Sequence, residues 1–67
     1  MEEAYKRFKQ GFTFTIKGEK DIGKIIDGLI DCAETDEDKL NVTTKLNRNY
    51  QIVIEETGEI TFRTLGV

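Results

Sequence analysis

The stretch GEKDIGKIIDGLIDCAE, residues 18–34, is the longest periodic segment of the chain. When it is projected at about 100° per residue, its apolar side chains fall on one side of a helix and its charged side chains on the other. The apolar side consists of Ile22, Ile25, Ile26, Leu29, Ile30 and Ala33. Because burying each large side chain contributes roughly 1.5–3 kcal/mol, we predict an amphipathic helix here that organises the fold.

The residues before this segment predict a short helix and then a strand. Within residues 2–10, acidic residues lie four positions before basic ones, which is the order of charges that favours a helix. Gly11 then provides a helix stop. The strict alternation of FTFTIK over residues 12–17 predicts a half-buried strand. The buried face of that strand would carry Phe12, Phe14 and Ile16.

The residues that follow the long helix predict a cap and two strands. Residues 35–38, TDED, resemble a capping box and predict a single turn. Apolar and polar residues alternate over residues 40–46, which predicts a second strand. Residues 47–49, NRN, then predict a three-residue loop that leads into a third strand over residues 50–54.

A second loop and a last strand complete the chain. Gly58 ends the loop over residues 56–58 and suits the left-handed conformation that such a loop requires. The last strand is predicted over residues 60–65. This loop predicts two cross-strand pairs, Ile54 with Ile60 and Ile52 with Phe62.

The predicted fold class is α+β, with a short N-terminal helix followed by a β-α-β-β-β order. One amphipathic helix packs on one face of a four-stranded, mainly antiparallel sheet. We expect residues 1–67 to form a single small domain, since the chain has no proline and no linker. The first strand should run parallel to its neighbour. A right-handed crossover favours a place beside the second strand, and a place beside the fourth strand stays open.

The composition excludes several chemistries. The chain has no histidine, which removes Ser-His and Cys-His nucleophile pairs and His-ligated zinc. Its one cysteine, Cys32, forms no internal disulfide and is interpreted as a small buried hydrophobic residue. The N-terminus lacks the pattern of a signal peptide, and no apolar run approaches the roughly 18 residues of a spanning helix. We therefore predict a non-enzymatic cytoplasmic protein without a cofactor, a metal or a membrane partner.

One segment comes close to a phosphate-binding motif. Residues 18–25, GEKDIGKI, fit the pattern G-x-x-x-x-G-K at the start of the predicted helix. Ile25 occupies the position where a hydroxyl should hold magnesium, and Glu19 and Asp21 would repel a polyphosphate. A nucleotide-dependent enzyme that uses Lys24 is accordingly the least supported of the functional hypotheses.

The far side of the long helix suggests a binding surface. Asp27 and Asp31 repel each other at a spacing of four residues, and acidic groups near a helix C-terminus oppose the macrodipole. We predict a partner-binding surface formed by Asp27, Asp31, Glu34, Asp36, Glu37 and Asp38. The expected partner is a basic protein, and the chain would act as a small regulator or inhibitor. So short a chain also fits a viral or mobile-element origin.

Two alternatives use the sheet. A nucleic-acid-binding module would use Lys17, Lys45 and Arg63 on the outer sheet face. That face has no aromatic side chain for base stacking, and the net charge of −3 argues against nucleic acid. A symmetric homodimer could instead form through a free edge of the last strand.

Overall fold

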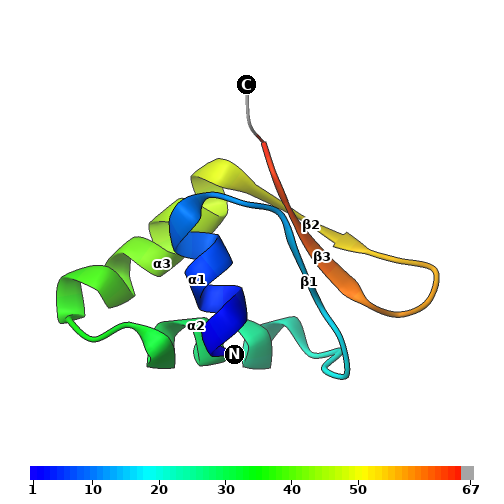
Figure 1. The fold of residues 1–67 in the computed structure, drawn as a ribbon, viewed down its shortest axis with the longest axis horizontal. Helices are drawn as coiled ribbons and strands as arrows, with labels where there is room; N and C mark the ends of the chain where they lie inside the picture. The colour runs from blue at the N-terminus through cyan, green and yellow to red at the C-terminus, as the bar shows by residue number, and fades with distance from the viewer. Residues whose placement is uncertain (66–67) are drawn as a thin grey trace.

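The computed structural model describes residues 1–65 and contains three helices and a three-stranded antiparallel sheet. In Figure 1 the helices gather at one side of the sheet, and the hairpin between the last two strands extends beyond them. None of the helices in this part of the chain is long and apolar enough to cross a membrane. The elements are α1 Glu2–Gln10, β1 Phe14–Ile16, α2 Ile22–Cys32, α3 Asp36–Asn49, β2 Tyr50–Ile54 and β3 Ile60–Thr64.

Helix α3 replaces the predicted second strand over residues 40–46 and the predicted loop over residues 47–49, so both predictions are wrong. The predicted cap at Thr35 is present, since its side-chain oxygen accepts a hydrogen bond from the Asp38 N–H at 3.1 Å. The chain continues from this cap as a long helix and not as a single turn. The residues buried in α3 lie four positions apart, which is the helical spacing. They are Val42 and Leu46.

The sheet has the order β1-β3-β2, and both pairings are antiparallel. The predictions of four strands and of a parallel first strand are therefore wrong, because α3 occupies the place of a strand. Of the two positions left open for the first strand, the one beside the last strand is observed. Strand β3 is central and paired on both sides, so it provides no free edge.

The β2–β3 hairpin confirms the predicted register. Its pairs include Ile54 with Ile60 and Ile52 with Phe62. The turn uses Gly58 at φ 91°, which is the left-handed conformation that glycine adopts without steric cost. The Glu55 N–H closes the hairpin by donating to the Glu59 carbonyl at 2.8 Å.

Helix α2 is shorter than the predicted helix over residues 18–34, since it begins after the cap residue Asp21 and ends at Cys32. Its predicted apolar side is confirmed: half of the six residues are buried, and the others pack partly buried against the core. The structure also explains Gly28. A Cβ atom there would lie 3.1 Å from the side chain of Met1, so glycine lets the N-terminus approach the helix.

Helix α1 spans the predicted residues 2–10, and Gly11 ends it in a left-handed conformation at φ 81°. The helix packs on the core through Phe8. Tyr50 ties the end of α1 to β2, because its hydroxyl donates to the Phe12 carbonyl at 2.9 Å and to the Phe8 carbonyl at 3.3 Å. The Phe12 side chain was predicted to be buried but is 59% exposed, since β1 begins only at Phe14.

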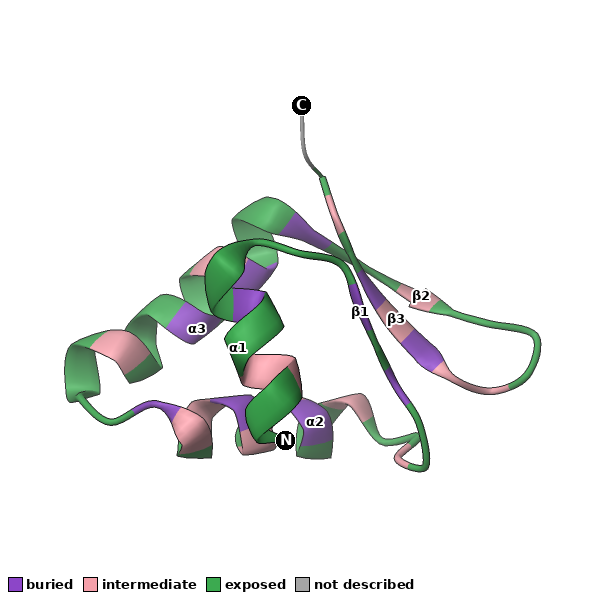
Figure 2. Cartoon of the chain, in the orientation of Figure 1, coloured by how far each residue is buried: buried purple, intermediate pink, exposed green. Residues whose placement is uncertain are grey.

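The core lies between the helices and the inner face of the sheet, as the buried positions in Figure 2 show. Aromatic rings fill its centre, and the closest pair is Phe14 and Phe62, whose ring centroids are 4.9 Å apart. Since α3 contributes Val42 and Leu46 to this core, the opposite side of α3 faces away from the protein.

Candidate functional site

Helices α2 and α3 form a helix-turn-helix unit, since only residues 33–35 separate them. Val42 and Leu46 fix which side of α3 packs on the core. Projection at 100° per residue then identifies the exposed side chains that point the other way. We call them the outward face of α3: Glu37, Leu40, Asn41, Thr44, Asn47 and Arg48. On one side of this face, Asn41, Thr44 and Arg48 also border a groove between α3 and α1.

The six predicted acidic residues follow one another through this unit. Two lie on the exposed side of α2, one lies in the turn, and three form the first turn of α3. We call residues 27–38 the acidic segment. All six side chains are exposed except that of Asp38, which is half-buried. Within residues 1–65 none of the six forms an ion pair, and no three of them gather into a metal-binding cluster.

The structure divides these acidic residues by their effect on the helices. Residues 36–38 lie in the first turn of α3, where negative charge interacts favourably with the macrodipole. Asp31 lies in the last turn of α2, and Glu34 follows it, so both oppose the dipole of α2. That last turn contains no basic residue. Helix stability therefore accounts for residues 36–38 and leaves Asp27, Asp31 and Glu34 without a structural role.

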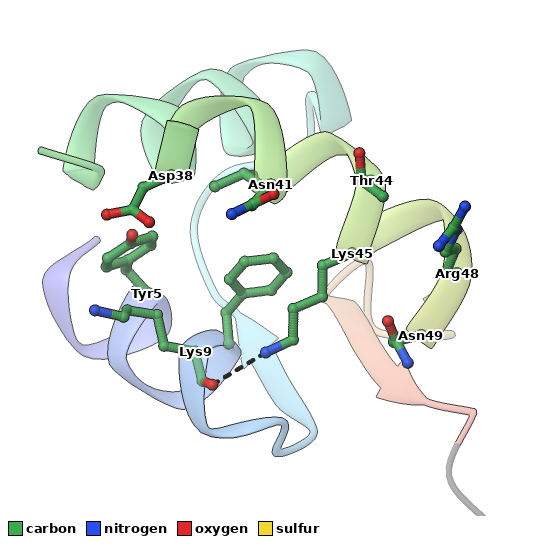
Figure 3. Close-up of a pocket in the computed structure, with 10 residues that line it drawn as sticks. Tyr5, Lys9, Asp38, Asn41, Thr44, Lys45, Arg48 and Asn49 are labelled. Atoms are coloured by element: carbon green, nitrogen blue, oxygen red, sulfur yellow. Dashed lines mark hydrogen bonds between the residues drawn. The ribbon is translucent and has the colours of Figure 1, made fainter. Parts of the chain in front are cut away.

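A groove of about 400 Å³ separates α1 from α3 (Figure 3). The Lys45 ammonium donates to the Lys9 carbonyl at 3.0 Å and lies 5.1 Å from the centre of the Phe8 ring. Figure 3 places Asp38 at one end of this groove and Arg48 at the other. Because Lys45 satisfies a carbonyl at the end of α1, it connects α3 to α1.

The three basic residues predicted for nucleic-acid binding do not form one surface. Lys45 lies in the groove because residue 45 is helical. The Lys17 ammonium lies 3.9 Å from the Glu59 carboxylate, at the other end of the sheet from the junction of α3 and β2. The Arg63 guanidinium donates to the Gln51 side chain at 2.9 Å on the outer sheet face.

The residues of the suggested phosphate motif, 18–25, make other interactions in the structure. The Asp21 carboxylate accepts from the Lys24 N–H at 3.4 Å, so the start of α2 is already capped by a negative group. Ile25 is fully buried, and the Lys24 side chain is exposed. A polyphosphate would therefore meet a carboxylate where it requires free N–H groups.

Leu40 is the surface residue that the sequence analysis missed. Its side chain is 70% exposed on the outward face of α3, although the predicted strand placed it on the buried face. The Thr35 cap and the acidic residues after it are the signals for a helix here, and in a helix that buries Val42 and Leu46 the Leu40 side chain lies on the outward side.

The candidate site is a surface and not a cleft, because Leu40 and most of the acidic residues are exposed. No protein-family model, curated protein or solved structure matches this chain. Its function is therefore inferred from the geometry and charge of its own residues.

Proposed function

We propose that the chain is a winged helix-turn-helix domain that binds a basic protein and acts as a cytoplasmic regulator or inhibitor. The order of its elements, α1-β1-α2-α3-β2-β3, supports the fold assignment, together with the strand order β1-β3-β2. The β2–β3 hairpin is the wing. Helix α3 occupies the position of the helix that contacts DNA in helix-turn-helix proteins.

The charge of the acidic segment is the observation that favours a protein as the partner. Residues 27–38 contain six acidic residues and no basic residue. In DNA-binding helix-turn-helix proteins, the N-terminal part of the second helix of the motif approaches base edges between two rows of phosphates. Here that part begins with three acidic residues, and the tip of the hairpin adds Glu55 and Glu56. Both elements would repel a duplex, and the acidic segment would attract a basic surface.

Leu40 supplies the apolar part of the surface. It lies one helical turn after Glu37 and is 70% exposed. Protein interfaces combine apolar anchors with a polar or charged rim. Leu40 is the anchor, and the acidic segment forms the rim that orients the basic partner.

The test is affinity capture from the native cells after nuclease treatment. The triple variant Asp27→Asn, Asp31→Asn and Glu34→Gln removes the acidic residues that have no structural role. It should lose the captured protein while keeping the circular dichroism spectrum of the fold.

A second triple variant serves as the matched control. Glu2→Gln, Glu55→Gln and Glu56→Gln change the net charge by the same amount, from −3 to 0, at exposed residues outside the acidic segment. This control should retain most of the captured protein. Equal loss in both variants, or no loss in the first, would contradict the proposed surface.

DNA binding is the second candidate function, because the helix-turn-helix unit itself favours it. The outward face of α3 also carries Asn41, Thr44, Asn47 and Arg48, which are residue types that contact base edges. Fluorescence anisotropy with a pool of randomised duplexes at low salt separates the two candidates. The proposal expects no saturable binding, whereas binding that Arg48→Ala abolishes would establish the DNA-binding alternative.

A further inference from the structure

Strand β2 is an unprotected sheet edge. It is an outer strand of the sheet, whose order is β1-β3-β2. Its residues Tyr50–Ile54 include no charged residue and no proline. Native proteins usually protect such edges with charged residues, proline or bulges. Here Ile52 is 38% exposed and Ile54 is 67% exposed, on the sheet face that also carries Phe62. Within residues 1–65 the edge therefore has unpaired backbone hydrogen-bonding groups and exposed apolar side chains.

The ladder with β3 shows which backbone groups face outward. The Leu65 N–H donates to the Asn49 carbonyl at 2.7 Å, and the Glu55 N–H donates to the Glu59 carbonyl at 2.8 Å. The odd-numbered residues therefore direct their hydrogen bonds toward β3. Because hydrogen-bonding directions alternate along a strand, Tyr50, Ile52 and Ile54 direct their N–H and C=O groups to the open edge.

We propose that a second copy of this chain pairs with β2 along this edge, antiparallel and centred on Ile52. In this register Ile52 faces Ile52 of the second copy, and Tyr50 faces its Ile54. Each of these facing pairs exchanges two N–H···O hydrogen bonds, because all of these residues direct their backbone groups outward. The two three-stranded sheets become one six-stranded sheet with a twofold axis at Ile52.

Two features favour a second copy over a strand of another protein. Facing residues in an antiparallel pair share one sheet face. Pairing about Ile52 therefore joins the exposed isoleucines of both copies into one apolar stripe. The charges at the ends are also complementary, since Arg48 precedes the strand by two residues and Glu56 follows it by two. The same register brings the basic end of one copy to the acidic end of the other.

This interface does not depend on the proposed partner surface. It uses the outer edge of β2, whereas the acidic segment lies at the opposite end of α3 and along α2. The failure of either proposal thus leaves the other to be judged by its own experiment.

The first test is the mass in solution, measured by size exclusion with light scattering over a range of concentrations. The wild-type chain should approach twice its 7.7 kDa mass as concentration rises. Ile52→Lys places two ammonium groups at the axis and should give a monomer, as should the more exposed Ile54→Lys. Leu40→Lys, the same kind of change at an exposed residue of α3, should remain a dimer.

The second test addresses the register. Arg48→Glu and Glu56→Arg should each weaken dimerisation about tenfold, because each brings like charges to both ends of the paired strands. The double variant restores opposite charges and should dimerise like the wild type. A monomeric wild type at the highest concentration, a dimer that tolerates both lysine variants, or a double variant without rescue would overturn the proposal.

Discussion

Tyr50 combines burial with two hydrogen bonds at the junction of α3 and β2. Its side chain is 5% exposed, and its hydroxyl donates to the carbonyls of Phe8 and Phe12. Burial removes water from the hydroxyl and raises the pKa of Tyr50 above its ordinary value of 10.0. The folded chain therefore favours the neutral side chain more strongly than the unfolded chain does.

Tyr50→Phe should lower the free energy of unfolding by about 1 kcal/mol at neutral pH, because two carbonyls lose a donor. The stabilisation from the raised pKa is fully present below pH 10 and is lost as the pH rises through the folded value. The variant should therefore lose less stability at alkaline pH than the wild type. Urea unfolding at neutral and alkaline pH measures both effects, and Tyr5→Phe is the matched control. An equal alkaline loss in the variant and the wild type would contradict this role.

Asp31→Asn should raise the free energy of unfolding by a few tenths of a kcal/mol. The change removes a negative charge from the last turn of α2 and relieves the repulsion with Asp27. Asp36→Asn should have the opposite sign, since Asp36 lies in the first turn of α3. Thermal unfolding compares the two variants, and equal signs would show that the dipole account of these residues is wrong.

A helix and a strand over residues 40–46 predict different stability changes for the same two substitutions. Leu46 is 8% exposed, so Leu46→Ala should cost about 2–5 kcal/mol. Leu40→Ala should change stability by about 0.5 kcal/mol or less, because Leu40 is 70% exposed. A strand over residues 40–46 would place both on one face and give both variants similar costs. Denaturant unfolding of the two variants distinguishes helix from strand.

Some elements could be predicted from local sequence alone. The β2–β3 hairpin was predicted correctly, because Gly58 and the alternation on both sides of it determine the register together. Helix α1 and the apolar side of α2 were also correct, since charge spacing and apolar periodicity are local signals.

Helix α3 could not be separated from a strand by periodicity. A strand has a spacing of two, which fits Val42, Thr44 and Leu46. A helix allows a spacing of four, which fits Val42 and Leu46 alone. The Thr35 cap and the acidic first turn were the decisive signals. The place of β1 depends on long-range pairing with β3, which no local pattern encodes. A strand over residues 40–46 also hides the outward position of Leu40 and the helix-turn-helix unit.

The charge of the whole molecule is unevenly distributed. The acidic segment surrounds the turn between α2 and α3, whereas Lys9, Lys45 and Arg48 line the groove between α1 and α3. The position of the acidic residues was predicted from sequence. Their arrangement around a helix-turn-helix unit required the structure.

Binding to the captured partner should weaken as ionic strength rises, because the acidic residues are exposed and screened by salt. Leu40→Ala should weaken binding at every salt concentration without changing the salt dependence, since the lost contact is apolar. Isothermal titration of the wild type and of Leu40→Ala at several salt concentrations measures the affinity and its salt dependence. An affinity independent of salt would contradict an electrostatic interface.

The most direct measurement is a backbone amide NMR titration of the chain, performed once with the captured partner and once with a randomised duplex pool. We predict that the partner shifts the signals of residues 27–40 and that the duplex leaves the spectrum unchanged. Shifts caused by the duplex along the outward face of α3 and the hairpin tip, without shifts from the partner over residues 27–40, would contradict the proposed function.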